Sequence, residues 1–231
     1  VIMQLICKMA VSPLRLLKQS PLPHGFFPHA KYNKAKGWLL PDEEALLLEC
    51  KDTPIHRRVF YGFLHREGMR FSEAAALKWA DLDLKRGTGS VTLDENKTSD
   101  PRAWALTPGV REALCAWKAY RELHHIAPTN PLVFVTERGK QFQTIDAAGA
   151  FRRHVAQAGI DRDVLFRQSP TRLRLRLHDT RTAFVTVALA NGKTESWVQD
   201  RTGHRTSRMI NLYRRAARTA AELGLGEFRR L

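Results

Sequence analysis

The stretch 177–215 reads LHDTRTAFVTVALANGKTESWVQDRTGHRTSRMINLYRR and contains the residues around which we expect the chain to be arranged. His178 and Arg181 are three residues apart, a spacing that puts two side chains on one face of a helix. Thr194 can cap a second, short helix, and Gly203 can end it in a left-handed turn. The sequence therefore predicts short helices joined by tight links.

A second histidine and a tyrosine follow this turn. His204 comes directly after Gly203, and Tyr213 lies nine residues later, along a third helix that should begin near Thr206. Short helices with such tight links must fold back on one another. We therefore expect imidazole, guanidinium and phenol groups to converge.

This combination of groups indicates chemistry on a phosphate. Guanidinium groups present rigid, forked donors that match phosphate oxygens, and imidazole moves protons near neutral pH. A phenol is a poor nucleophile until it is positioned and deprotonated, but it can form a covalent ester. The pattern predicts attack of a tyrosine on a phosphodiester, with cationic groups around the non-bridging oxygens.

The charge of the chain indicates a polyanionic partner. There are 38 Lys and Arg against 23 Asp and Glu, a formal net charge of +15. Nucleic acid is the usual partner of so basic a protein, and a basic surface that only aids solubility is the alternative. Three widely spaced cysteines indicate reduced thiols in a cytoplasmic protein. The apolar residues 1–11 are too short to span a bilayer and lack the layout of a signal peptide.

The order His-x-x-Arg, Gly-His and Tyr resembles the catalytic core of the tyrosine recombinase (phage integrase) family. That family carries an earlier arginine in the motif Gly-x-Arg-x-x-Glu, followed by Leu-x-Trp-x-Asp-hydrophobic-Asp. The residues that match this motif here are Gly68, Arg70, Glu73, Leu77, Trp79, Asp81 and Asp83.

The chain around this motif should aim Arg70 from a junction between helices. Gly68 is expected to stop one helix, and Ser72 is expected to cap the next, which carries Trp79. Glu73 is expected to orient Arg70 or to cap the helix, and not to act as a catalytic acid.

A β-hairpin is predicted from strands at 90–93 and 103–106 around a polar turn at 95–101. Lys97 lies in this turn, and in the resembling family a mobile hairpin lysine protonates the leaving 5′-oxygen. Exposure to solvent is the alternative for Lys97. Arg102 is a candidate phosphate contact from the same hairpin.

Further arginines are candidates for contact with a DNA backbone. Arginines alternate with leucines over residues 171–177, which puts the two kinds of side chain on opposite sides of an extended chain. The alternation favours phosphate contacts, and an edge strand protected by charge is the alternative. Two more lie on a helix predicted at 144–158, where DNA contact and plain solvation are equally consistent. The candidates are Arg102, Arg152, Arg153, Arg172, Arg174 and Arg176.

The resemblance implies six catalytic residues: Arg70, Lys97, His178, Arg181, His204 and Tyr213. It implies that Tyr213 attacks the scissile phosphate and forms a 3′-phosphotyrosyl link, which frees a 5′-hydroxyl. Arg70 and Arg181 would clamp the non-bridging oxygens and stabilise the charge of the transition state.

The remaining three would handle protons and the phosphate. Lys97 would be the general acid for the leaving oxygen, and His178 would accept the tyrosine proton or help to hold the phosphate. His204 would hydrogen-bond the phosphate. The ester keeps the energy of the broken bond, so that neither ATP nor a metal or other cofactor is expected. The histidines lack Cys or carboxylate partners at the spacing of metal ligands.

The chain departs from the family pattern at a few positions. Glu67 stands where threonine is common before the glycine, and Thr180 and Thr182 replace the more usual leucine and histidine. Arg201 and Thr202 replace an apolar pair before the Gly-His motif. None of these changes removes a catalytic group.

We therefore predict a mainly α-helical fold with a small antiparallel β-sheet or hairpin, a tyrosine recombinase-like, DNA breaking–rejoining catalytic domain. Residues 1–38 are interpreted as the remnant of an amino-terminal DNA-binding region with its linker, and residues 39–231 as the catalytic domain. The expected function is that of a site-specific recombinase, the integrase of a mobile element. It would act on double-stranded DNA as a homotetramer, in the cytoplasm and associated with the nucleoid.

Three other functions are alternatives. A type IB topoisomerase shares this active-site chemistry and would relax supercoiled DNA without a defined site. A catalytically silent DNA-binding protein derived from an integrase would not need all six groups. A metal-dependent nuclease would need clustered carboxylates, which the sequence lacks.

Overall fold

The structure, a computed structural model, describes residues 2–23, 26, 34–85, 89–94, 101–145 and 147–231. Its contacts divide the chain into two units, Val1–Ala35 and Lys36–Leu231. In the first unit, helix α1 (Ile2–Val11) leaves Ile2, Leu5 and Ile6 exposed. Strand β1 (Ala35–Lys36) lies at the division between the units.

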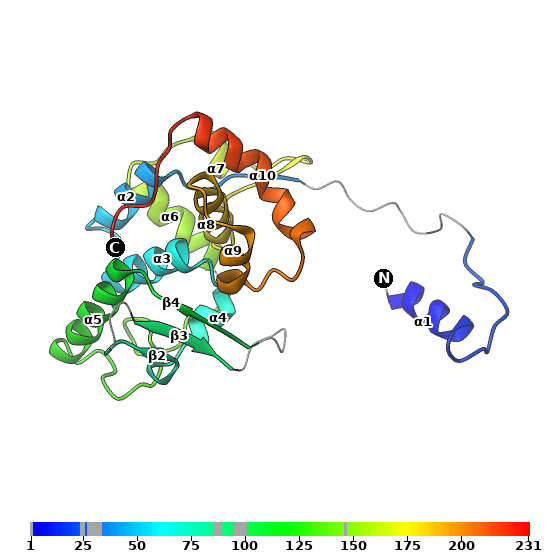
Figure 1. Ribbon diagram of the computed structural model, residues 1–231, viewed down its shortest axis with the longest axis horizontal. Coiled ribbons are helices and arrows are strands. Elements are labelled where there is room, and N and C mark those ends of the chain that lie inside the picture. The colour runs from blue at the N-terminus through cyan, green and yellow to red at the C-terminus, as the bar shows by residue number, and fades with distance from the viewer. Residues whose placement is uncertain (1, 24–25, 27–33, 86–88, 95–100, 146) are drawn as a thin grey trace. The chain divides into compact units, whose positions relative to one another are not determined.

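The second unit is mostly helical, as predicted (Figure 1). Its α-helices are α2 (Pro41–Glu49), α3 (Ile55–Glu67), α4 (Phe71–Ala76), α5 (Pro108–Leu123), α6 (Ala147–Gln157), α7 (Asp163–Phe166), α8 (Asp179–Ala190), α9 (Glu195–Thr202) and α10 (Ser207–Glu222). A 3₁₀ turn, η1, spans Trp79–Asp81, and a short strand, β5, spans Arg172–Leu173.

The predicted hairpin belongs to a three-stranded antiparallel sheet. Strands β2 (Leu82–Asp83), β3 (Ser90–Leu93) and β4 (Arg102–Ala105) follow one another in the order β2-β3-β4. Strand β4 begins one residue earlier than predicted, and Val91 pairs with Trp104. Side chains alternate along β4, so that Arg102 and Trp104 are buried while Ala103 and Ala105 are exposed. The arginine is therefore part of the inner face of the sheet.

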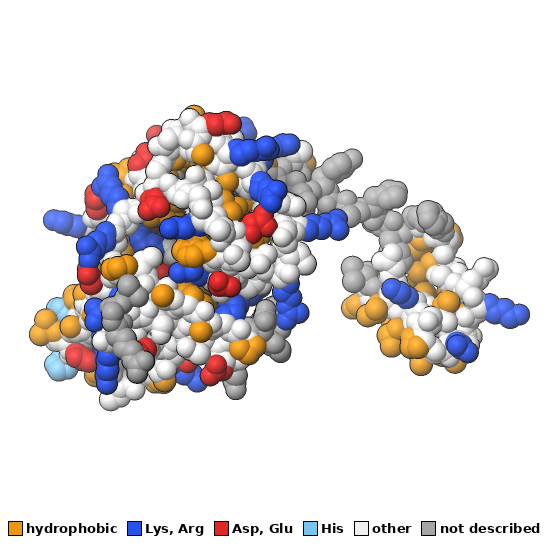
Figure 2. Space-filling model, viewed as in Figure 1, with side chains coloured by type: hydrophobic (Ala, Val, Ile, Leu, Met, Phe, Trp, Pro, Cys, Tyr) orange, Lys and Arg blue, Asp and Glu red, His pale blue; other side chains and the backbone are white. Residues whose placement is uncertain are grey.

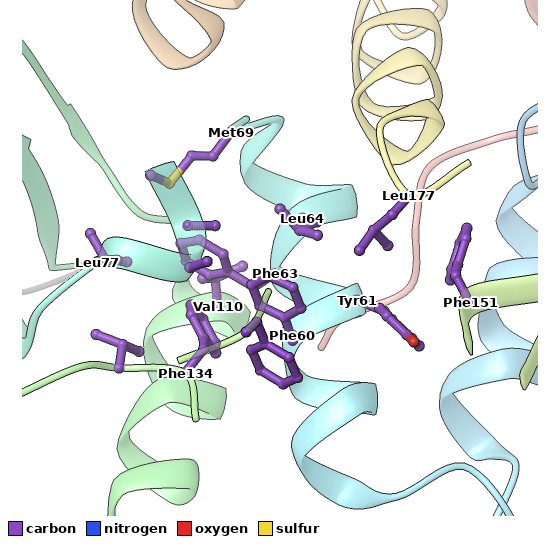
Figure 3. Close-up of a cluster of buried hydrophobic side chains, with 14 of the residues drawn as sticks. Phe60, Tyr61, Phe63, Leu64, Met69, Leu77, Val110, Phe134, Phe151 and Leu177 are labelled. Atoms are coloured by element: carbon purple, nitrogen blue, oxygen red, sulfur yellow. The ribbon is translucent and has the colours of Figure 1, made fainter. Parts of the chain in front are cut away.

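The main core is built around α3, which runs through the middle of the second unit (Figure 1). Phe60, Tyr61, Phe63 and Leu64 are all fully buried, so the helix is covered on most of its circumference. Figure 3 shows Phe60 and Phe63 beside Phe134, with ring centroids 5.2 and 4.8 Å from it. Burial of such large rings supplies most of the driving force for this packing.

A smaller apolar cluster holds the predicted stretch 177–215 together. Helix α8 contacts both α3 and α10, and its Phe184 and Val185 pack with Val198 of α9 and Ile210 of α10. The partly buried ring of Tyr213 packs against this cluster. The three helices therefore fold back on one another as the sequence predicted.

Two local predictions were wrong. Ser72 lies inside α4, and Arg70 is the residue at its amino-terminal boundary. A Glu73 carboxylate oxygen accepts the backbone N–H of Arg70 at 3.1 Å, which fixes the start of the helix earlier than a Ser72 cap would. Helix α4 also ends before Trp79, because the Leu77 carbonyl accepts the N–H of Val133 at 2.8 Å instead of continuing the helix.

In the part of the chain that the structure describes, no helix has both the length and the apolar character needed to cross a bilayer.

Gly68 gives a direct test of this packing. It ends α3 with a φ of 60°, and a Cβ there would lie 2.2 Å from Phe184. We expect Gly68→Ala to lower the free energy of unfolding by about 1 kcal/mol for the left-handed backbone, plus ~1–3 kcal/mol for the displaced ring. Urea denaturation would measure this loss.

Gly192→Ala is the matched control, because Gly192 also has a positive φ, 78°, but its added Cβ would meet nothing within 4 Å. It should show the backbone cost alone. Equal losses in the two variants would contradict the packing described for Gly68.

Candidate active site

Arg70 is aimed by the turn between α3 and α4. Gly68 leaves α3 in the left-handed conformation, and Arg70 then adopts an extended backbone at the start of α4. Glu73 accepts from the guanidinium of Arg70 at 2.6 Å and from its backbone N–H at 3.1 Å. Glu73 therefore orients Arg70 and caps the helix, as the sequence predicted.

Arg102 reaches the same carboxylate from β4. Its Nη2 lies 3.0 Å from Glu73 Oε2, and both side chains are buried. Burial alone would raise the pKa of Glu73, but Arg102, together with hydrogen bonds from Arg70 and Arg102, outweighs it and holds that pKa below its usual value. One ionised carboxylate thus holds two guanidinium groups side by side.

Arg181 ties together two turns that are far apart in sequence. Its Nη1 donates to the Gly68 carbonyl at 2.8 Å, and its Nη2 donates to the Thr202 carbonyl at 2.5 Å. Burial, followed by the charge of Arg70, lowers the pKa of Arg181 to about 10, so the group remains charged at neutral pH. The site therefore contains three fixed positive charges.

His204 is set by the turn that ends α9. Thr194 Oγ1 accepts the N–H of Trp197 at 3.2 Å at the start of that helix, and Gly203 ends it with a φ of 65°. Both features were predicted. Burial, followed by Arg181 and Arg70, lowers the pKa of His204 to about 3, so the ring is neutral at pH 7 in the free protein.

The tautomer of His204 follows from its neighbour. Thr202 Oγ1 donates to the Val198 carbonyl at 2.6 Å and also lies 2.9 Å from His204 Nδ1. Since a hydroxyl has one hydrogen, Thr202 must accept from Nδ1–H. The Nε2 atom of the neutral ring then carries a lone pair.

Tyr213 lies beside this imidazole. The two rings have centroids 5.8 Å apart and are inclined by 42°. Burial raises the pKa of Tyr213, while Arg181 and a hydrogen bond with Thr182 oppose that rise. The phenol is therefore protonated at neutral pH, in the electrostatic field of the Arg181 guanidinium.

His178 stands at the amino terminus of α8, where its side chain is exposed. The following residue, Asp179, is buried and pairs with Arg176, whose Nη2 lies 2.8 Å from Asp179 Oδ1. The loss of water on its protein-facing side, followed by Arg181, lowers the pKa of His178. His178 is neutral at pH 7 and able to accept a proton.

The other predicted residues have different settings. Lys97 lies outside the described residues. Arg152 donates to the Leu175 carbonyl at 2.7 Å. Burial, followed by the charge of Arg174, lowers the pKa of Arg152. The exposed residues among these candidate DNA contacts are Arg153 and Arg174, and the half-buried ones are Arg152, Arg172 and Arg176.

The structure thus brings five of the predicted catalytic residues into one electrostatic network, and Arg102 joins them. Its central position was missed, because the sequence placed it only as an accessory contact. The alternation along β4, with Arg102 in step with Trp104, was the available signal. A hollow of about 520 Å³ opens beside Arg102, Gly203 and His204.

Within the described residues, no group of three or more His, Cys, Asp or Glu side chains is placed to hold a metal ion.

Figure 2 shows Lys and Arg side chains over the face in view, interspersed with Asp and Glu.

Comparisons with known proteins agree on one family. The family model described as the phage integrase family matches residues 38–219. Two curated proteins named integrase/recombinase, from Escherichia coli and Pseudomonas aeruginosa, are each 29% identical over 204 residues. These matches cover 72% of this chain and 56% of each relative, so the chain spans little more than half of their length.

Solved structures share the fold. XerA recombinase matches with a TM-score of 0.63 and 22% identity, covering 81% of this chain and 65% of that chain. A lambda integrase tetramer bound to a Holliday junction matches with a TM-score of 0.66 and 15% identity, covering 92% of this chain and 57% of that chain.

The shared carboxylate of Glu73 can be tested by stability. We expect Glu73→Gln to lower the free energy of unfolding at pH 7 by about 3 kcal/mol, because it leaves Arg102 buried without a counter-charge. Since its folded-state pKa is lowered, the contribution of Glu73 is present above the ordinary value of 4.5 and is lost as the pH falls through the folded-state pKa.

Denaturant unfolding from pH 3 to pH 8 would measure both effects. Glu195→Gln is the control, because Glu195 pairs with Arg214 at the exposed surface and should matter little. A Glu73→Gln variant as stable as Glu195→Gln at pH 7 would contradict the role given to the shared carboxylate.

Proposed function

This chain belongs to the phage integrase family, and we propose that it is a site-specific DNA recombinase that cleaves and rejoins DNA through a 3′-phosphotyrosyl intermediate. The observation that carries the proposal is the position of Tyr213. Its ring lies 5.8 Å from that of His204, and its ionisation is coupled to Arg181. A nucleophile beside fixed cations is the arrangement that attack on a phosphodiester requires.

The chemistry would proceed as a transesterification. The Tyr213 oxygen bonds to phosphorus as the bond to the 5′-oxygen breaks, so one phosphate ester replaces another. Arg70 and Arg181 would hold the non-bridging oxygens, with Arg102 beside them. Because ester bonds are conserved, rejoining to another strand would consume neither ATP nor a metal cofactor.

Two protons must move in this step. His178, neutral and exposed at the start of α8, would accept the phenol proton. Lys97, which lies between β3 and β4 in the sequence, would protonate the leaving 5′-oxygen, a role carried over from the family. His204 can donate to a phosphate oxygen only after its Nε2 takes up a proton, and an adjacent phosphate would raise its pKa and favour this uptake.

The partner would be double-stranded DNA, on which we propose that the protein acts as a homotetramer. A net charge of +15 supports a polyanionic partner, and the structure of lambda integrase named above is a tetramer on a Holliday junction. Arg153 and Arg174 would contact the DNA backbone as exposed cations. Residues 1–38 would contribute to a DNA-binding region with its linker, and the protein would work in the cytoplasm at the nucleoid.

A type IB topoisomerase is the second candidate, because the same tyrosine chemistry would serve it. Relaxation of supercoiled plasmid that lacks a defined site would favour the topoisomerase. Activity that disappears in EDTA would favour a metal-dependent nuclease instead. Specific binding with no covalent product would indicate a silent DNA-binding protein.

Tyr213→Phe tests the proposal directly. We expect it to reduce covalent capture by at least about 10³-fold, since the attacking oxygen is gone, while DNA binding stays within about threefold. The assay would incubate the full chain with nicked suicide duplexes taken from the DNA that flanks its gene, and mass spectrometry would map the modified residue.

Tyr120→Phe is the control, because Tyr120 is an exposed tyrosine on α5 whose ring lies against Trp117 and His124. It should give normal covalent yield. A normal yield from Tyr213→Phe would refute the nucleophile assignment.

A further inference from the structure

Two of the residues that depart from the family pattern meet behind the active site. Glu67, at the end of α3, is fully buried, and Trp104 Nε1 donates to its Oε2 at 2.6 Å. Burial raises the pKa of Glu67, and the positive charge of Arg201, on α9, opposes that rise. Burial lowers the pKa of Arg201, and the negative charge of Glu67 opposes that fall. A carboxyl, an indole and a guanidinium from three separate elements therefore form one buried polar cluster.

Arg201 is fixed within this cluster by its other contacts. Its guanidinium lies 3.7 Å above the Trp197 ring, and its Nη2 donates to the Ala105 carbonyl at 2.9 Å. The buried Glu67 Oε1 and Arg201 Nε have no hydrogen-bond partner among the described residues. Each charge is compensated by the other, with Arg66 adding to the effect on Glu67 and Asp200 to that on Arg201, because a buried and uncompensated charge is unfavourable.

Each member of the cluster lies within three residues, along the chain, of a group of the site. Glu67 precedes Gly68, whose carbonyl accepts from Arg181. Trp104 lies on the same face of β4 as Arg102, and Arg201 precedes the turn that carries His204. A displacement within the cluster would therefore move all three site groups at once.

We propose that Glu67 is a positioning residue for strand cleavage. Through Trp104 and Arg201 it fixes the positions of β4, the end of α3 and the end of α9 relative to one another at the active site. The proposal rests on the proposed recombinase function for its effect on rate. A displacement of about 1 Å is sufficient to slow a reaction that depends on alignment. Glu67 itself does not touch the reacting atoms.

The charge of Glu67 makes this coupling sensitive to pH. Burial raises the pKa of Glu67 to about 7, against the hydrogen bond from Trp104 and the charges of Arg201 on α9 and Arg66 on its own helix. Above pH 7 the ionised carboxylate attracts Arg201 and accepts strongly from Trp104. Below that pH the proton weakens both interactions.

The first experiment follows the cluster without any DNA. The chain has five tryptophans, so ¹⁵N NMR should show five indole N–H signals, and Trp104→Phe identifies that of Trp104 by its absence. We expect this signal to shift with a midpoint near pH 7 in the wild type and not to titrate in Glu67→Gln. A signal that does not titrate, or that titrates equally in both proteins, would overturn the proposal.

The second experiment measures the rate of covalent capture from pH 6 to pH 8.5. Glu67→Gln keeps the acceptor for Trp104 but stays neutral, so it should match the wild type at pH 6 and be about tenfold slower at pH 8, with DNA binding unchanged. Trp104→Phe should be slow throughout. A constant ratio of Glu67→Gln to wild type at every pH would overturn the positioning role.

Trp117→Phe is the matched control for lost packing. It removes another buried indole hydrogen bond, from Trp117 Nε1 to the Val133 carbonyl at 2.8 Å, on a helix that carries no site residue. It should lose stability but keep the wild-type rate of capture, and an equal slowing in Trp117→Phe and Trp104→Phe would refute the proposal. A wild type that forms no covalent product at any pH would refute the recombinase function, whereas the NMR titration would still test the cluster.

Discussion

The two hydrogen bonds from Arg181 to backbone carbonyls are the interaction on which the rest of the site depends. One reaches Gly68 at the end of α3, and the other reaches Thr202 at the end of α9. Because both acceptors belong to the main chain, the guanidinium fixes the path of two turns as well as its own position. The residues after those turns, Arg70 and His204, are thereby aimed at the same place.

The electrostatics of the site follow from this arrangement. Several cationic groups surround one shared carboxylate, that of Glu73. It fixes the positions of the Arg70 and Arg102 guanidinium groups but does not cancel their combined charge. Burial, reinforced by the charge of Arg181, lowers the pKa of both His178 and His204 and keeps them neutral. The site of the free protein thus carries a net positive charge that favours an anion, and a bound phosphate would raise the pKa of each imidazole.

Local sequence was sufficient wherever one segment decides its own structure. Thr194 and Gly203 bracket α9 through contacts within that helix, and Gly68 ends α3 through its own backbone. The starting residue of α4 was missed because the Glu73 side chain accepts the backbone N–H of Arg70, three residues earlier, and so fixes the start of the helix in place of a Ser72 cap. The cluster of Glu67 and Trp104 was beyond reach, since 37 residues separate a pair that only the tertiary fold brings together.

The contact between Gly203 and Arg102 has an evolutionary consequence. A Cβ at position 203 would lie 2.1 Å from Arg102 Nη1, so a side chain in the turn would have to displace the guanidinium that Glu73 holds. Homologues that keep the arginine should consequently keep the glycine, whereas a shorter residue on the strand would remove the collision but leave the conformational cost of a φ of 65° at position 203.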